Sequence, residues 1–314
     1  MELSKKQDFS FDIATLTDYT NENTGLMARA VYGAKTISSG IEVLPGQKGN
    51  VSLNVNINDI YLQAAACGWT TSGHTWLKQM DVAVCRCDYM EALCPKDLEV
   101  KWYGQLMAKG SMPETYPFAE YVLDNKIAEL STQIEYMFWQ ADTKHGSGNL
   151  ALCAGMADFL SGCTGLDFCP QGTGYTAADI IASVNYMVAD LDERVAMRDD
   201  LVLFMPIADY RTWIQQLVNA NMYHYDPGNS NEFEYKIPGT NITAMGVPGL
   251  RGTHYWYLTP KSNIVFVTDL LDETEDLDMW YSRDNREIRI NGSFKFGVGV
   301  YFCEFVVTNN ALLV

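Results

Sequence analysis

The sequence has few basic residues relative to its acidic ones. Of its 314 residues, 22 are Lys or Arg and 39 are Asp or Glu, so the formal net charge is −17. Proteins that bind nucleic acid need clustered cations to displace counterions from phosphate, whereas Lys5-Lys6 is the only adjacent basic pair here. We therefore expect a protein that repels DNA rather than binds it.

Membrane and secretion signals are also lacking. No stretch approaches the roughly 18 to 20 apolar residues of a membrane span, and residues 1–10 lack the apolar core of a signal peptide. We expect no membrane partner and a protein made and used in a cytoplasm, where thiols stay reduced. No CxxC occurs, and Cys163 and Cys169 lack zinc spacing, so small buried apolar side chains are favoured over a zinc site. The eight cysteines are Cys67, Cys85, Cys87, Cys94, Cys153, Cys163, Cys169 and Cys303.

Short motifs of catalytic and cofactor sites do not occur either. GxSxG, GxxxxGK[ST] and HExxH are absent. A GxGxxA match at residues 172–177 follows a proline rather than a strand, so we reject a dinucleotide site. The acidic run 271–278 lacks the spacing of a calcium loop. The histidines fall in separate loops, without metal spacing or an adjacent carboxylate: His74, His145, His224 and His254. We predict no catalytic, metal-binding or cofactor-binding residue, no cofactor and no enzyme.

Aromatic residues are plentiful while charged residues are scarce. The chain has 18 Tyr, 13 Phe and 7 Trp, and only 19% of its residues are charged, against about 25% in typical domains. Interfaces favour Tyr and Trp. This composition is expected of a protein whose surface is largely covered by partners, or of one with a large aromatic core.

Residues 117–142 predict one long helix. Thr115 can cap it, and Pro117 suits its first turn because the missing N–H costs nothing there. About 26 residues give a rod of about 39 Å, longer than the average helix of about 11 to 12 residues. Strand-rich sequence lies on both sides, so a scaffold is favoured over a catalytic barrel, with an ordinary α+β protein as the alternative. Its apolar residues recur at spacings of three and four: Leu123, Ile127, Leu130, Ile134, Met137 and Phe138.

Residues 40–88 predict a long β-hairpin that follows an irregular arm at residues 1–39. Apolar and polar residues alternate over 51–57 and again over 80–84. Between these strands lies a tip rich in Gly, Ser and Thr that carries Trp69 and Trp76. A two-stranded hairpin is marginally stable alone, so we expect it to lie on another surface, either its own domain or a partner.

The rest of the chain predicts strands sandwiched by helices, an α/β domain. A helix runs from residue 177 to about 195, after a capping pair of Thr176 and Asp179. Residues 201–205 read as a buried strand, and Pro206 starts another helix. A long polar loop covers 221–241, short strands are expected at 242–247 and 264–268, and the end is strongly β, at 287–290 and again at 294–302. The expected core of this domain includes Ile180, Ile181, Val184, Leu203 and Ile214.

This order of elements resembles the major capsid protein of tailed bacteriophages, which has the Hong Kong 97-like fold. DLVLFMPIADYRTWIQQL resembles the family's axial strand and helix, and MWYSRDNREIRINGSFKFGVGVYFCEFVV its closing strands. CGWTTSG and LCPKDLEVKW resemble the hairpin and the strand after it in one phage subgroup. The resemblance implies an α+β fold of four parts: an N-terminal arm at 1–39, an extension loop at 40–80, a peripheral domain with the spine helix at 81–144 and 270–314, and an axial α/β domain at 145–269.

The resemblance implies a structural role without turnover. Subunits would self-assemble as pentamers and hexamers into an icosahedral shell that encloses double-stranded phage DNA without binding it specifically. Assembly would take place in the bacterial host cytoplasm, and the final location would be the virion capsid. Scaffolding, portal and decoration proteins are implied partners, the scaffold being separate or a removed prefix because the sequence shows no long charged helical prefix. Expected inter-subunit contacts are Trp69, His74 and Trp76.

Three alternatives stay open. An encapsulin-like bacterial nanocompartment shell would share the fold and would need a cargo-docking groove. A soluble α/β enzyme with an unrecognised site belongs to a different class. A tail or baseplate protein is disfavoured because such proteins usually lack a long spine helix.

Overall fold

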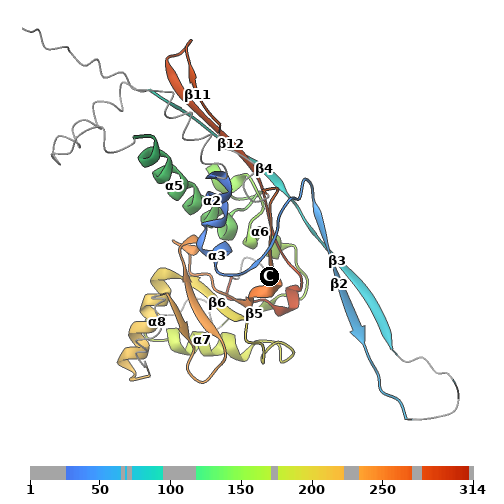
Figure 1. Ribbon diagram of the computed structural model, residues 1–314. Coiled ribbons are helices and arrows are strands. Elements are labelled where there is room, and N and C mark those ends of the chain that lie inside the picture. The colour runs from blue at the N-terminus through green and yellow to red at the C-terminus, as the bar shows by residue number, and fades with distance from the viewer. Residues whose placement is uncertain are drawn as a thin grey trace, which may run out of the picture. The chain divides into compact units, whose positions relative to one another are not determined.

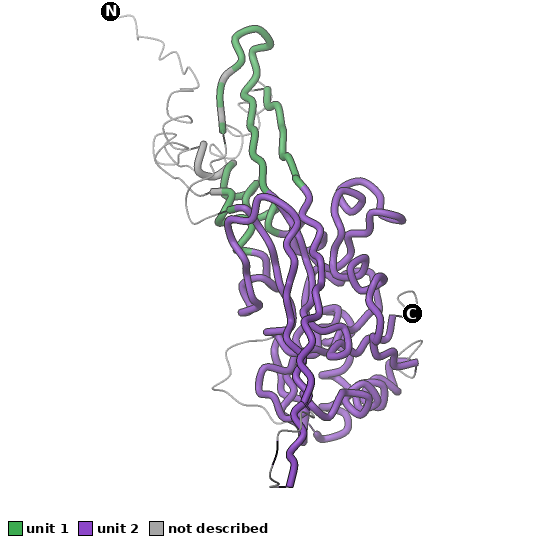
Figure 2. Tube along the Cα trace, turned by 90° about the vertical axis from the view of Figure 1, so that its right-hand side faces the viewer, with its two compact units in different colours: residues 1–33, 86–131, 270–294 green, residues 34–85, 132–269, 295–314 purple. Residues whose placement is uncertain are grey.

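The structure is a computed structural model that describes residues 26–64, 68, 73–94, 118–170, 176–222, 233–270 and 278–310. Its contacts divide the chain into two compact units (Figure 2). Unit 1 comprises residues 1–33, 86–131 and 270–294, and unit 2 comprises residues 34–85, 132–269 and 295–314. Within the described ranges, no helix is both long and apolar enough to cross a membrane.

Unit 2 is built on a mixed six-stranded sheet with the order β5-β13-β9-β6-β8-β7. Neighbouring strands are parallel in the pairs β5–β13 and β6–β8 and antiparallel in the other three pairs. The strands are β5 (Asp167–Phe168), β6 (Leu201–Pro206), β7 (Glu234–Lys236), β8 (Thr243–Val247), β9 (Tyr257–Pro260) and β13 (Val307–Thr308). Every residue of β6 is buried, as its continuous apolar run predicts for a central strand.

Two amphipathic helices cover this sheet and complete its core. In α7 (Ile180–Ala189), the buried residues Ile180, Val184 and Met187 are spaced four and three apart. Helix α8 (Ile207–Asn219) starts directly after Pro206 and buries Tyr210, Trp213 and Leu217 at the same spacing. These side chains form one hydrophobic cluster with β6, β8 and β9. The predicted α/β arrangement is therefore present, with α7 shorter than the helix expected to reach residue 195.

A second sheet lies partly in unit 2. There β1 (Glu42–Leu44) pairs in parallel with β10 (Ile264–Val267), which pairs antiparallel with residues 297–300 of β12 (Glu287–Val300). The hairpin strands β2 (Val51–Asp59) and β3 (His74–Val82) form a separate two-stranded sheet. Short helices connect these strands: α3 (Lys35–Ser38), α6 (Met156–Ser161), η2 (Gly148–Ala151), η4 (Pro248–Leu250), η5 (Lys261–Asn263) and η6 (Cys303–Phe305).

Unit 1 contains α2 (Leu26–Tyr32), the first part of α5 (Phe118–Gln140), β4 (Cys85–Leu93) from Arg86 on, β11 (Asp278–Ser282) and the first part of β12. Strands β4 and β11 both pair with β12. The Lys126 ammonium donates to both carboxylate oxygens of Glu91 at 2.6 Å, and the Tyr89 hydroxyl donates to the same carboxylate. These bonds join α5 to β4 within the unit.

The long helix is confirmed: α5 begins one residue after Pro117 and continues to Gln140 in unit 2. Its buried Glu135 accepts bonds from the backbone N–H of Thr36 at 2.8 Å and from the Thr36 hydroxyl. The Trp139 indole donates to the same hydroxyl at 2.8 Å. Burial raises the pKa of Glu135, while the Thr36 bonds act in the opposite direction. This network holds α3 against the C-terminal half of α5.

Several elements differ from the sequence-based expectation. The β-rich end is not two strands, because the alternation of buried and half-buried residues continues through Gly292, and β12 runs unbroken for 14 residues. Strand β7 lies inside the expected polar loop; it is a three-residue strand that pairing with β8 defines. The hairpin strand β3 begins at His74, so His74 and Trp76 lie in a strand rather than in the tip. Residues 26–38 of the expected arm form α2 and α3.

The expectation of reduced cysteines is wrong for four of the eight. Cys85 is bonded to Cys153 and Cys163 to Cys303, across 68 and 140 residues of sequence. Both bonds lie within unit 2. Cysteine spacing gave no sign of them because each pair is brought together only by the tertiary fold.

We predict that Gly249→Ala destabilises the chain. A Cβ on Gly249 would overlap the carbonyl oxygen of Glu135 and the Trp139 ring, both on α5. Backbone atoms must then shift, which costs about 1 to 3 kcal/mol in the free energy of unfolding. Gly49→Ala is the control, because a Cβ there meets nothing within 4 Å, and we expect it to be neutral or stabilising by up to about 1 kcal/mol. Urea unfolding of both variants measures the difference, and equal stabilities would contradict the close packing of η4 on α5.

Candidate functional site

The β2–β3 hairpin is the most distinctive element of unit 2. The strands pair antiparallel over nine residues each, from Val51 opposite Val82 to Asp59 opposite His74. In Figure 1 this ribbon extends well beyond the other elements of unit 2. The alternation in the sequence produces it, because residues two apart point to the same face of a strand.

The two faces of the hairpin differ in chemistry. Directly opposed residues share a face, so the register sorts the side chains into two sets. One face, called here the apolar face, carries Val51, Leu53, Val55, Ile57, Asp59, His74, Trp76, Lys78, Met80 and Val82. The other carries Ser52, Asn54, Asn56, Asn58, Thr75, Leu77, Gln79 and Asp81. On this second face Asp81 accepts from Ser52 at 2.6 Å and from Gln79 at 3.1 Å, and these bonds lower the pKa of the Asp81 carboxyl.

The apolar face is covered at one end only. At the base, Leu53, Val55 and Val82 are buried, and Leu53 and Val82 pack against Val265 and Val267 of β10. At the distal end Trp76 is 52% exposed. Beyond the paired strand, Ile60 is 81% and Leu62 97% exposed. The subunit thus buries the apolar face at the hairpin base and leaves Trp76 at its distal end exposed, while the exposed Ile60 and Leu62 lie beyond the paired strands.

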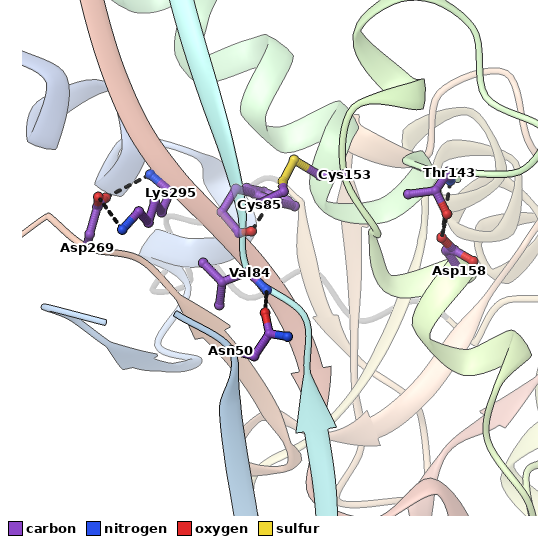
Figure 3. The surroundings of a disulfide bond; sticks show 9 residues. Asn50, Val84, Cys85, Thr143, Cys153, Asp158, Asp269 and Lys295 are labelled. Carbon is purple, nitrogen blue, oxygen red and sulfur yellow. Dashed lines mark hydrogen bonds and ion pairs between the residues drawn. A yellow bond between two sulfur atoms is a disulfide. The ribbon is translucent and has the colours of Figure 1, made fainter. Parts of the chain in front are cut away.

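Glycines in β12 let the hairpin base approach this sheet closely. A Cβ on Gly299 would overlap the Val82 side chain, and one on Gly297 would lie 3.0 Å from the Ala83 carbonyl oxygen and 3.1 Å from Val84 Cγ2. Hydrogen bonds then fix the strand ends. Asn50 accepts from the Val84 N–H at 3.1 Å (Figure 3), and the Lys295 ammonium donates to the Lys48 carbonyl at 2.8 Å.

Two further contacts tie the hairpin base to unit 2. The Cys85–Cys153 disulfide lies directly after the base (Figure 3). Farther out, the Lys78 ammonium lies 3.9 Å from Glu304, which also accepts from Arg194 at 3.1 Å. Arg194 in turn binds Asp192, and these hydrogen bonds lower the pKa of the Asp192 carboxyl. Among the described residues of the hairpin, Lys78 is the most distal one with an ion pair to its own unit.

The predicted contact residues lie at the uncovered end. His74 and Trp76 are exposed neighbours on the apolar face, with stacked rings 5.8 Å apart. Trp69 lies outside the described residues. Sequence reasoning missed Ile60, Tyr61 and Leu62, whose unbroken apolar run beyond the expected strand was the available signal. Whether these residues touch another subunit stays a prediction.

The predicted core residues are buried to different degrees. In α5, Leu123, Ile134 and Phe138 are buried while Ile127 and Leu130 are half-buried. In the α/β part, Ile180, Val184 and Leu203 are buried, and the half-buried Ile181 and Ile214 pack against the same cluster.

Two histidines do have adjacent carboxylates, contrary to the sequence-based expectation. His145 Nδ1 lies 2.9 Å from Asp142 Oδ2, and His254 Nδ1 lies 3.1 Å from Asp209 Oδ1. Asp209 is buried and also accepts from the Trp256 indole at 2.9 Å. Chain folding brings Asp209 to His254 across 45 residues, which no local spacing reveals. This pair ties the start of α8 to the segment before β9.

A cavity of about 490 Å³ also lies in unit 2. Its walls include the aromatic rings of Trp139, Tyr255 and Tyr257. Lys144 and His145 at this cavity pair with Asp158 and Asp142 respectively. The charges around the cavity are therefore largely neutralised within the subunit.

We predict that two hairpin leucines differ strongly in their effect on stability. Leu53→Ala removes a side chain that is 4% exposed, and we expect it to lower the free energy of unfolding by about 2 to 5 kcal/mol. Leu77→Ala removes one that is 77% exposed, and we expect a change within about 0.5 kcal/mol. Chemical unfolding of the unassembled subunit checks this. Similar losses for both variants would show that the distal hairpin also packs on its own subunit.

The similarity to known proteins lies in structure rather than sequence. No family model matches the chain, and no curated protein matches it in sequence. A chain of the satellite phage P4 procapsid, solved with its size determination protein, matches with a TM-score of 0.59 and 12% identity over 90% of this chain and 95% of that chain. Gordonia phage Cozz gives a TM-score of 0.56 and 10% identity over 88% and 85%. The virus-like particle from Pyrococcus furiosus gives 0.53 and 9% over 93% and 100%. The chain therefore has the α+β, Hong Kong 97-like fold of phage capsid subunits.

Proposed function

We propose that this chain is the major capsid protein of a tailed bacteriophage, a subunit that assembles with copies of itself into a closed shell. The observation that carries the proposal is the half-covered apolar face of the hairpin on a capsid fold. Leu53 and Val55 at its base are buried, while Trp76 farther out is exposed. The fold match to phage P4 and phage Cozz supports the same role.

A second copy of the chain is the occupant that fits the distal half of the apolar face. A two-stranded ribbon is marginally stable in water, and exposed aromatic and aliphatic side chains on it favour burial in an interface. Head-to-tail contacts between identical subunits produce closed rings. In this arrangement each hairpin is held by its own subunit at Leu53 and Val82 and covers a neighbour with Ile57 and Trp76.

The finer features of the proposal follow from the fold family and the charge. Subunits form pentamers and hexamers, and the shell encloses double-stranded DNA, which slides along its wall because the net charge of −17 repels phosphate. Residues 1–39 act as an arm, 40–80 as the extension loop, 81–144 and 270–314 as the peripheral domain, and 145–269 as the axial domain. Assembly takes place in the host cytoplasm with scaffolding, portal and decoration proteins, and the role is structural rather than enzymatic.

An alternative shell is a bacterial nanocompartment that encloses protein rather than DNA. The match to the virus-like particle from Pyrococcus furiosus favours it, since the whole of that chain is covered. Both proposals require self-assembly, so the content of the particle distinguishes them.

Expression of the chain alone and with its neighbouring genes tests the proposal. Size-exclusion light scattering and negative-stain microscopy should show rings or closed shells of megadalton mass. Packaged DNA in particles from the natural source would identify a phage capsid, and protein cargo would identify a compartment. A monomer or small dimer under all conditions would contradict both shell proposals.

We predict that Trp76→Ala weakens the shell without unfolding the subunit. The substitution removes apolar area that the subunit itself leaves exposed, and truncation of a buried interface tryptophan costs about 2 kcal/mol or more per contact. Trp69→Ala is expected to act in the same way. Thr75→Ala, on the opposite face of β3, is the control and should leave the shell unchanged. Particle dissociation in urea is the measurement, and equal midpoints for Trp76→Ala and Thr75→Ala would refute the interface.

A further inference from the structure

Each disulfide lies next in sequence to a residue that contacts the hairpin. Cys85 follows Val84, whose N–H donates to Asn50 at the end of the hairpin. Cys303 precedes Glu304, which forms the ion pair with Lys78. Each disulfide therefore fixes the backbone next to one of these contacts.

Both disulfides have one half-buried and one buried member. Cys85 and Cys163 are half-buried, whereas Cys153 and Cys303 are each 1% exposed. Thiol–disulfide exchange requires access to one sulfur by a thiolate. A half-buried cysteine can meet a small reagent, and its buried partner can then complete the exchange inside the protein.

We propose that these disulfides form a redox-controlled lock on the hairpin base, open while the subunit is reduced and closed after oxidation. The inference rests on the proposed shell function. A reducing cytoplasm keeps cysteines as thiols, so newly made subunits hold the hairpin only by packing and polar contacts at its base. Oxidation after assembly fixes the base while the distal half is covered by a neighbour.

The chemistry of the lock is a two-electron oxidation by a small-molecule disulfide such as oxidised glutathione. The thiolate of Cys85 attacks one sulfur of the reagent, forms a mixed disulfide and releases one reagent thiolate. The thiolate of Cys153 then attacks Cys85 Sγ, forms the protein disulfide and releases the second reagent thiolate. Two protons leave the protein and are taken up by the two reagent thiolates, so the protein is oxidised and the reagent is reduced. Cys163 and Cys303 follow the same course.

Freedom at the base has a direct structural consequence. Without the disulfides, the ribbon of β2 and β3 is held at Val82–Val84 by its packing on Gly297 and Gly299 of β12 and by polar contacts. A reduced base allows the distal face to find its neighbour during assembly. An oxidised base removes this freedom and makes release of the neighbour slower.

Hydrogen exchange of the unassembled wild-type chain, before and after treatment with dithiothreitol, tests the lock without any substitution. We expect amides of residues 51–55 and 78–82 to exchange at least tenfold faster after reduction, while amides of β6 keep their protection. Alkylation and peptide mapping verify which thiols are free. Unchanged exchange at the base would overturn the proposal. Faster exchange in β6 as well would also overturn it, because the disulfides would then hold the whole unit.

Variants connect the lock to the shell. The quadruple variant combines Cys85→Ser, Cys153→Ser, Cys163→Ser and Cys303→Ser. Its shells should dissociate at the same urea concentration with and without dithiothreitol, whereas wild-type shells should dissociate at a lower urea concentration after reduction. Cys94→Ser removes an exposed cysteine outside both disulfides and is the matched control, expected to behave as wild type. If dithiothreitol leaves the urea midpoint of wild-type shells unchanged while their four cysteines become alkylated, the lock is refuted and the shell function stands. Failure of the wild type to form particles would instead refute the shell function. Failure of only the serine variants to form particles would refute the lock, because the lock requires subunits without disulfides to assemble.

Discussion

The packing of the hairpin base on the glycine-containing end of β12 is the contact on which the proposed assembly depends. A Cβ at position 299 would overlap the Val82 side chain, and one at position 297 would lie in tight contact with Ala83 and Val84. The close crossing therefore favours glycine at both positions, most strongly at 299. A two-stranded ribbon is only marginally stable in isolation. Burial of its base together with Leu53 stabilises it here. Its distal apolar face is then presented to a partner at no cost to the subunit's own core.

The remaining parts of unit 2 form the core to which the hairpin base is attached. The six-stranded sheet, α7 and α8 form a separate core around β6, and the Glu135 network holds α3 to the end of α5. Strand β12 contributes to both units, because its first residues pair with β11 and its last with β10. Helix α5 and strand β12 are both long continuous elements with residues in each unit.

The sequence predicted those helices and strands that have a clear local pattern of apolar residues. The period of α5, the apolar run of β6 and the alternation in β2 each specify one structure, and all three were predicted. Strands β5, β7 and β13 have two or three residues and exist only through pairing, so propensity could not find them. The disulfides and the His254–Asp209 pair join residues far apart in sequence. The same alternation includes the buried Leu53 and the exposed Trp76. The sequence could therefore predict the apolar face, but not how far along the hairpin the rest of the subunit buries it.

The most direct test of the central claim compares hydrogen exchange along β2 and β3 in free subunits and in assembled particles. If a neighbouring copy completes the apolar face, amides near Leu53 and Val82 are protected in both states, and those near Ile57 and Trp76 become protected only on assembly. Distal amides that are already protected in the free subunit, or that stay unprotected in the particle, would show that the hairpin is not the element that joins one copy to the next.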